Sequence, residues 1–194
     1  MISQSRILLA SGSPRREEIL RALGLDFVVQ PVDVDEQLLA GESAEQMVLR
    51  LARAKAAAAT AYDGDLVIGA DTAVVLEEQV LGKPRDEADA VTMLLRLSGK
   101  THCVMTGVAL RGPHGVQDAL SRTLVKFRVI SRDEALAYWH SGEPADKAGA
   151  YAVQGMGGVF VERLEGSHSG VVGLPVYETA ELLRAAGVRV INKL

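Results

Sequence analysis

Residues 11–16 read Ser-Gly-Ser-Pro-Arg-Arg and follow an apolar segment, an arrangement that could bind an anion. Ser13 suits the N-cap of a helix, and Pro14 suits its first position. Arg15 and Arg16 then place two cations at the positive end of the helix dipole, which costs free energy. A phosphate held by backbone N–H groups and both guanidinium groups would reverse that cost. We therefore predict a phosphate-binding turn; the alternative is an ordinary cap followed by two exposed arginines.

Asp71 is a candidate catalytic carboxylate. It follows residues 66–70, an apolar stretch that should be buried as a central strand, so its carboxylate is expected to emerge at a strand end. Ligands bind at that edge in α/β sheets. Asp71 could instead start a turn, but residues 72–76 continue with types that favour a strand. The pattern favours a functional carboxylate.

Two lysines could add positive charge to such a site. Lys55 falls inside the apolar stripe of a helix predicted over 43–60, so it either extends past the core to solvent or points into a site. Both interpretations remain open. Lys83 lies between Gly82 and Pro84, which restricts its backbone to an extended conformation, and taken alone it is typical of a surface lysine.

Further polar residues lie in predicted loops. Asp35 and Glu36 are adjacent carboxylates, usually solvated in such a segment, but carboxylates also bind Mg²⁺. Gln154 could recognise a base edge through its amide, although a loop glutamine commonly binds nothing. An anion-binding turn, two more cations and separate carboxylates together indicate polyphosphate chemistry.

The elements that must position these residues alternate between strand and helix. Predicted strands cover 6–10, 26–30, 66–76 (as one strand or a pair), 101–111, 116–130 and 159–164. Predicted helices cover 14–23, 43–60, 86–97, 131–141 and a last segment from Pro175 to near Gly187, with a capping box of Ser131 and Glu134. Residues 112–115 predict a hairpin, and the Gly-rich residues 145–158 predict a loop. This order indicates an α/β domain with a mixed sheet.

Composition narrows the class of protein. The chain has 194 residues, 48% of them apolar, which predicts one domain over 1–194. Its apolar runs are far shorter than the ~20 residues of a membrane span, and no basic segment with a long apolar core begins it, so we expect a cytoplasmic protein without membrane contact. The net charge of −4 and scattered basic residues argue against a nucleic-acid partner. With one cysteine and four dispersed histidines, any metal should be hard and oxygen-bound.

Seven segments together resemble the Maf family of nucleoside triphosphate pyrophosphatases. They are, in order, Ala-Ser-Gly-Ser-Pro-Arg-Arg (10–16), Arg-Leu-Ala-Arg-Ala-Lys-Ala (50–56), Gly-Ala-Asp-Thr (69–72), Gly-Lys-Pro (82–84), Asp-Lys-Ala-Gly-Ala-Tyr (146–151), Gln-Gly (154–155) and Val-Val-Gly-Leu-Pro (171–175). The resemblance implies a mixed, elongated, twisted sheet with flanking helices and two lobes around a deep cleft, related to inosine triphosphate pyrophosphatase. It also implies hydrolysis between the α and β phosphates with a divalent cation, Mg²⁺ or Mn²⁺.

The resemblance also assigns roles to individual residues. Asp71 would be the proton acceptor, and Glu36 would join it in holding the metal. The groups that would hold the triphosphate are Ser11, Ser13, Arg15, Arg16, Lys55 and Lys83. Arg15, Thr72 and Gln154 would set the choice of substrate. The segments around Gln154 resemble the branch that acts on dTTP and UTP, whereas the other branch tends to carry Glu at this position. An amide suits that role, since it can donate to a uracil carbonyl and also accept from N3–H, whereas a carboxylate can only accept.

The resemblance leaves other functions open. The second bacterial branch acts on 7-methyl-GTP, and modified nucleotides are further candidate substrates. A nucleotide-binding regulator of cell division and septum formation would bind without turnover. A homodimer is compatible with the resemblance.

Overall fold

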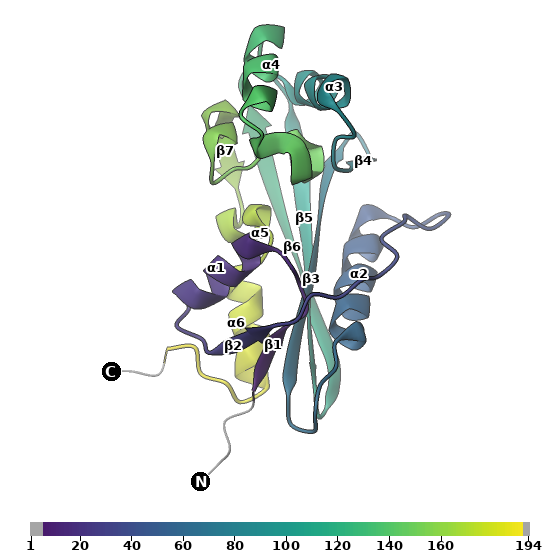
Figure 1. Ribbon diagram of the computed structural model, residues 1–194, viewed down its shortest axis with the longest axis vertical. Helices are drawn as coiled ribbons and strands as arrows, with labels where there is room; N and C mark the ends of the chain where they lie inside the picture. The colour runs from purple at the N-terminus through teal and green to yellow at the C-terminus, as the bar shows by residue number, and fades with distance from the viewer. Residues whose placement is uncertain (1–5, 192–194) are drawn as a thin grey trace. The chain divides into compact units, whose positions relative to one another are not determined.

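In residues 6–191, the part of the chain described by the computed structural model, seven strands form a mixed sheet flanked by helices (Figure 1). The hydrogen-bonded order is β2-β1-β3-β5-β6-β7, and β4 pairs with β3 off this path. β1 is parallel to both β2 and β3, whereas β4 is antiparallel to β3 and β7 to β6. The predicted mixed α/β class is therefore confirmed.

The strands are β1 (Ile7–Leu9), β2 (Phe27–Val29), β3 (Leu66–Leu76), β4 (Gln79–Leu81), β5 (Thr101–Gly112), β6 (Gly115–Phe127) and β7 (Val161–Glu165). The α-helices are α1 (Pro14–Ala22), α2 (Ala44–Ala58), α3 (Glu87–Leu97), α4 (Arg132–His140), α5 (His168–Val172) and α6 (Val176–Ala185). Three short 3-10 helices are η1 (Glu143–Asp146), η2 (Ala148–Ala150) and η3 (Met156–Phe160).

The chain divides into two compact units. The first comprises residues 1–71, 106–121 and 173–194, and the second comprises residues 72–105 and 122–172. β3, β5 and β6 each contribute residues to both units. A single domain over 1–194 and a cleft between two lobes stay predictions.

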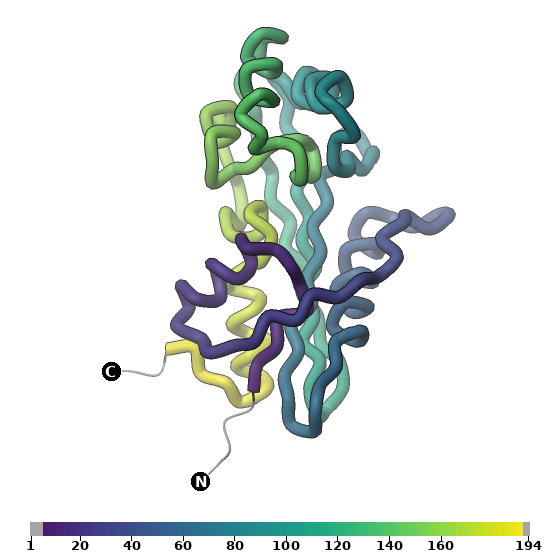
Figure 2. The backbone as a smooth tube through the Cα atoms, in the orientation of Figure 1, coloured from purple at the N-terminus to yellow at the C-terminus, as the bar shows by residue number. Residues whose placement is uncertain are grey.

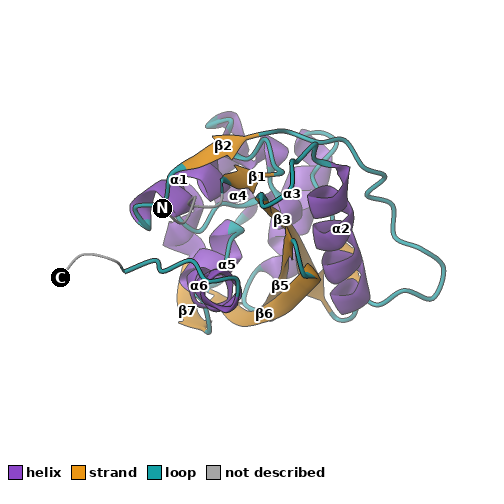
Figure 3. Cartoon of the chain, turned by 90° about the horizontal axis from the view of Figure 1, so that it is seen from below, coloured by secondary structure: helices purple, strands orange, loops and turns teal. Residues whose placement is uncertain are grey.

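In the first unit, helices cover both faces of the sheet (Figure 3). Successive strand residues point to opposite faces, and the two hydrophobic clusters follow this alternation. One cluster joins strand residues to α1 and α6, and includes Ile7, Leu9, Leu20, Leu66, Ile68, Leu182 and Leu183. The other joins strand residues to α2, and includes Leu8, Ala10, Ala52, Ala56 and Val67. Odd-numbered residues of β3 near Val67 therefore face α2.

Gly69 allows α2 to lie directly on β3. A Cβ at Gly69 would stand 2.3 Å from the carbonyl oxygen of Ala52 and 2.6 Å from the backbone nitrogen of Ala56. These are backbone atoms in the middle of a helix, so they cannot move aside without shifting α2. The glycine thereby fixes how closely the helix approaches the strand.

We expect Gly69→Ala to lower the free energy of unfolding by about 1–3 kcal/mol or more, the usual cost of overpacking a core. Urea denaturation followed by circular dichroism measures the effect. Gly82→Ala is the matched control, since nothing lies within 4 Å of its Cβ position, and its stability should stay near that of the wild type. Equal stability of the two variants would contradict the close contact.

The second unit has its own core between α3, α4 and the sheet. Its buried members include Val74, Leu76, Leu94, Val104 and Phe127. Phe127 makes edge-on ring contacts with His102 and Tyr151, and Tyr138 makes one with Phe160. These rings pack α4 and the segment that follows it onto the strands.

Most predicted elements are correct to within two residues, and the exceptions have local causes. Residues 156–160 form η3, so the strand predicted over 159–164 begins at Val161. The strand predicted over 116–130 ends at Phe127 because the chain then turns into the N-cap of α4 at Ser131. β4 and α5 were not predicted from the sequence. The loop predicted over 145–158 is largely short 3-10 helix.

No helix within residues 6–191 combines the length and apolar character that crossing a membrane requires.

Candidate functional site

A buried lysine joins two carboxylates in the first unit. The Nζ of Lys55 lies 2.7 Å from Oδ1 of Asp71 and 2.5 Å from Oε1 of Glu36. Lys55 and Asp71 are each only 8% exposed, whereas the side chain of Glu36 is 53% exposed. The ambiguity over Lys55 is thus resolved, because its ammonium ends at a site and not in open solvent.

Asp71 occupies the middle of β3, so the prediction that it emerges at a strand end is wrong. β1 pairs with residues 66–68 of β3, and β4 pairs with residues 74–76. β3 thus continues for five residues past Asp71, as the strand predicted over 66–76 requires. The carboxylate lies two residues after Gly69 on the face that α2 covers, which is why Lys55 of α2 reaches it.

The side chain of Glu36 reaches the ammonium group of Lys55 from a loop. Residues 30–43, between β2 and α2, contain no helix or strand and form a long excursion of the backbone (Figure 2). The guanidinium group of Arg50 in α2 holds this loop, donating to both carboxylate oxygens of Glu42 at 2.5 and 2.8 Å and to the carbonyl oxygen of Gln37 at 2.9 Å. Arg50 was not predicted as a positioning residue. Its partners, Glu42 and Gln37, lie in the loop before α2, and the pattern of the helix does not indicate them.

Arg16 and Ser11 form the second part of the site. Nη1 of Arg16 donates to Oγ of Ser11 at 3.1 Å, and Nε donates to the carbonyl oxygen of Gly173 at 2.7 Å. Ser11 is 7% exposed. Ser13 occupies the N-cap position of α1, but its side chain makes no capping bond. Its backbone N–H instead donates to Oγ of Ser11 at 3.2 Å, so the predicted hydroxyl cap is wrong although the predicted helix start is right.

Burial and charge act on the site in opposite directions. Burial raises the pKa of Asp71, and the charge and hydrogen bond of Lys55 together with the charge of Arg16 oppose that rise. Burial lowers the pKa of Arg16, while the negative charge of Asp71 acts to raise it. A carboxylate that is shielded from water yet surrounded by cations is suited to accept a proton from a bound water molecule.

The two carboxylates fit a divalent cation. Glu36 and Asp71 both approach one ammonium group, so two hard oxygen donors already converge on a single positive charge. Within residues 6–191, no group of three or more His, Cys, Asp or Glu side chains could hold a metal by itself. Mg²⁺ is often bound through one or two carboxylates together with substrate phosphates. Glu36 and Asp71 would supply the two carboxylates of such a site.

The structure brings together half of the predicted site residues. Ser11, Arg16, Glu36, Lys55 and Asp71 are connected by the contacts and charges described above. Arg15 and Ser13 lie beside them in the chain and are partly buried. Thr72, Lys83 and Gln154 belong to the second unit, where Lys83 and Gln154 are exposed. Their membership of the same site stays a prediction.

Comparison with known proteins identifies the family of this chain. Residues 6–186 match the family described as Maf-like protein. The dTTP/UTP pyrophosphatase of Methylobacillus flagellatus is 49% identical over 192 residues, which covers 97% of this chain and 96% of that protein. The dTTP/UTP pyrophosphatase of Vibrio cholerae is 52% identical, covering 92% of this chain and 97% of that protein.

A protein of the same name from Myxococcus xanthus is 53% identical over 95% of this chain and 94% of its own length. Among solved structures, that of the Staphylococcus aureus Ham1 protein is similar with a TM-score of 0.45 and 16% identity, covering 63% of this chain and 72% of that one. With the family match extending over nearly all of the described residues, this chain belongs to the Maf family.

Proposed function

We propose that this chain is a nucleoside triphosphate pyrophosphatase that hydrolyses dTTP and UTP to the nucleoside monophosphate and pyrophosphate. The observation that carries the proposal is the buried Asp71 carboxylate, in contact with Lys55 and facing the charge of Arg16. Three relatives about half identical to this chain over nearly its whole length are named dTTP/UTP pyrophosphatases, which supports the substrate assignment.

In this mechanism Asp71 is the general base. A water oxygen attacks the α phosphorus, Asp71 takes the proton from that water, and the bond from the α phosphorus to the bridging oxygen breaks to release pyrophosphate. The Asp71 carboxylate is suited to this role because burial favours its protonated form, while the neighbouring cations keep it available as an acceptor.

The basic side chains would offset the negative charge of the triphosphate. Lys55 and Arg16 are anchored beside Asp71, and Ser11 adds a hydroxyl group. Arg15, Ser13 and Lys83 are proposed to bind the remaining phosphate oxygens. These cations stabilise the negative charge that develops on the phosphate oxygens during cleavage. They therefore lower the activation barrier as well as binding the substrate.

Glu36 and Asp71 are proposed to hold a divalent cation, Mg²⁺ or Mn²⁺. When bound, such a cation polarises the phosphoryl group and lowers the pKa of bound water. Lys55 would then exchange part of its contact with the two carboxylates for contact with phosphate oxygens. A cytoplasmic location and a homodimer stay predictions.

The experiment that tests the function is a nucleotide panel assayed with Mg²⁺, with the monophosphate and pyrophosphate measured separately. We expect equal amounts of the two products, with the highest kcat/KM for dTTP and UTP. Nucleotide binding without release of either product would contradict the enzyme. Preference for 7-methyl-GTP would overturn the substrate assignment.

Gln154 is proposed, together with Thr72 and Arg15, to set the preference for a uracil or thymine base. We expect Gln154→Glu to lower kcat/KM for dTTP and UTP relative to the other nucleotides by roughly 5–10-fold, because the carboxylate can accept but not donate and one base hydrogen bond is lost. The same panel measures this ratio. Unchanged relative kcat/KM values would remove Gln154 from this role.

A further inference from the structure

In the second unit, a carboxylate and the tyrosine bonded to it hold the two flanks of the loop that carries Gln154. The loop, residues 152–157, follows η2 and includes the first two residues of η3, and it faces Tyr138 of α4 and Glu143 of η1. We propose that Glu143 is a positioning residue for substrate selection, acting with Tyr138 to fix the backbone on either side of Gln154. This inference rests on the proposed function, in which Gln154 contacts the base.

Four hydrogen bonds make the attachment. The backbone N–H groups of Met156 and Gly157 donate to Oε2 and Oε1 of Glu143, each at 3.0 Å. The hydroxyl group of Tyr138 donates to Oε1 of Glu143 at 2.6 Å and accepts from the backbone N–H of Ala152 at 3.0 Å. The loop is thus tied at its first residue and at its last two, and only 153–155 lie between the ties.

The segment between the ties is a tight turn. The backbone N–H of Gly155 donates to the carbonyl oxygen of Ala152 at 3.3 Å, which places Gln154 at the third position of a four-residue turn. Gln154 is exposed there. Its backbone is therefore held while its side chain remains accessible to a ligand.

Close packing leaves the turn little freedom. A Cβ at Gly155 would lie 2.1 Å from Oε2 of Glu143, and a Cβ at Gly157 would lie 2.5 Å from the Tyr138 hydroxyl. A side chain after Gln154 would therefore displace the Glu143 carboxylate from its bonds to Met156 and Gly157. This gives a structural reason for the Gln-Gly pair that the sequence analysis singled out.

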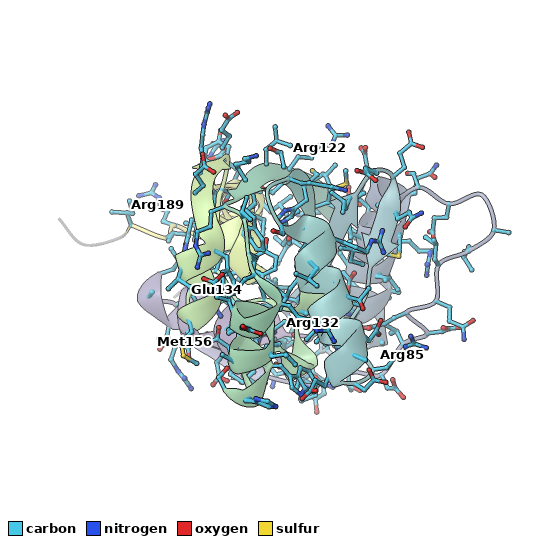
Figure 4. The ribbon with its side chains drawn as sticks, turned by 90° about the horizontal axis from the view of Figure 1, so that it is seen from above. Arg85, Arg122, Arg132, Glu134, Met156 and Arg189 are labelled. Atoms are coloured by element: carbon cyan, nitrogen blue, oxygen red, sulfur yellow. The ribbon has the colours of Figure 1, made fainter. Side chains whose placement is uncertain are left out.

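Glu143 accepts three of these four bonds, and it does so as an ionised group. Partial burial would raise the pKa of Glu143, but the hydrogen bonds from Tyr138, Gly157 and Met156 outweigh it, and the pKa is lowered. Tyr138 is 6% exposed, and burial raises its pKa, so it stays a donor. Met156 itself lies exposed at the edge of the molecule (Figure 4); its backbone N–H, and not its side chain, makes the contact.

We expect Glu143→Gln to loosen the loop, because the amide offers one oxygen to three donors and turns its own N–H groups toward backbone N–H groups. Losing one or two such bonds should lower the ratio of kcat/KM for UTP to that for GTP by about 5–10-fold. Tyr138→Phe, which keeps the ring in the core, should shift the ratio in the same direction by a smaller factor. Amide hydrogen exchange at residues 152–157 should accelerate in both variants.

Ser131→Ala is the matched control. It removes the N-cap of the same helix α4, where Oγ of Ser131 accepts from the backbone N–H of Glu134 at 3.2 Å, and should cost about 1 kcal/mol of stability. Glu134, at the first turn of α4, is labelled in Figure 4. Ser131 lies at the start of α4, whereas Tyr138, which contacts the loop, lies near its end. The ratio of kcat/KM for UTP to that for GTP should therefore stay at the wild-type value.

A double-mutant cycle with Gln154→Ala decides whether Glu143 acts through Gln154. If it does, adding Glu143→Gln to Gln154→Ala leaves the UTP to GTP ratio unchanged. Additive effects in the cycle, or a selectivity loss in Ser131→Ala equal to that in Glu143→Gln, would overturn the inference. So would faster hydrogen exchange in Glu143→Gln with an unaltered ratio. The proposed function fails separately, if the wild-type protein itself shows no preference for UTP and dTTP.

Discussion

Asp71→Asn is expected to bind dTTP but to hydrolyse it about 10²–10⁴-fold more slowly than the wild type, the usual contribution of a positioned general base. Asparagine has nearly the same shape as aspartate but cannot take a proton from water. The side chain should remain buried beside Lys55, so the fold should survive. Initial rates of pyrophosphate release, with dTTP affinity measured by calorimetry, test both parts.

Asp118→Asn is the matched control for this variant. Asp118 forms an ion pair with Arg53 in the same unit and makes no contact with Lys55, so removing its charge should leave kcat within a factor of about two, since exposed pairs contribute little. Turnover by Asp71→Asn at the wild-type rate would refute the assignment of the base. Loss of activity in Asp118→Asn to the same extent would show that the effect is not specific to Asp71.

Lys55→Met is expected to reduce kcat/KM for dTTP by about 10²–10³-fold, the usual loss when one charge-stabilising group leaves an active site. The variant should also move the acid limb of the pH profile to higher pH. Burial raises the pKa of Asp71, and the charge and hydrogen bond of Lys55 oppose that rise, so removing the lysine lets the pKa climb. Since the base acts when deprotonated, activity then begins at a higher pH.

Kinetics from pH 5 to pH 9 distinguish the charge of Lys55 from its shape. Lys55→Arg keeps the positive charge, so its acid limb should stay near that of the wild type even where its rate falls. Lys100→Met, which removes an exposed lysine paired with Glu77, should leave the profile unchanged. An acid limb that stays in place or moves to lower pH in Lys55→Met would contradict the electrostatic coupling.

The sequence predicts local structure well where the signal lies within a single helix or strand. The apolar stripe of α2 places Lys55 on the inward face, and the capping residues Ser43, Asp86 and Ser131 mark helix starts that the structure reproduces. Short elements are harder. β4 has three residues, and its existence depends on pairing with β3, a contact that no periodicity of its own sequence encodes.

Contacts between distant segments account for the rest of the site. Lys55 and Asp71 are separated by 16 residues, and the close approach of α2 to the sheet at Gly69 and Gly107 brings their elements together. Arg50 and Glu143 act through backbone groups of loops, so nothing in their residue type indicates the role. Family resemblance predicts which residues face the ligand, whereas the contacts of Arg50 and Glu143 are seen only in the folded chain.

The contact between Arg16 and Gly173 has a consequence for when the first unit can fold during synthesis. Its guanidinium group is anchored on the carbonyl oxygen of Gly173, 157 residues later in the chain. Leu174, Leu182 and Leu183, which follow that anchor, complete the cluster beneath α1 and β1. A nascent chain that has not yet been extended as far as α6 therefore lacks both the Gly173 anchor for its turn at residues 11–16 and a cover for β1. β1 and the turn that follows it can therefore complete their packing only after α6 has been synthesised.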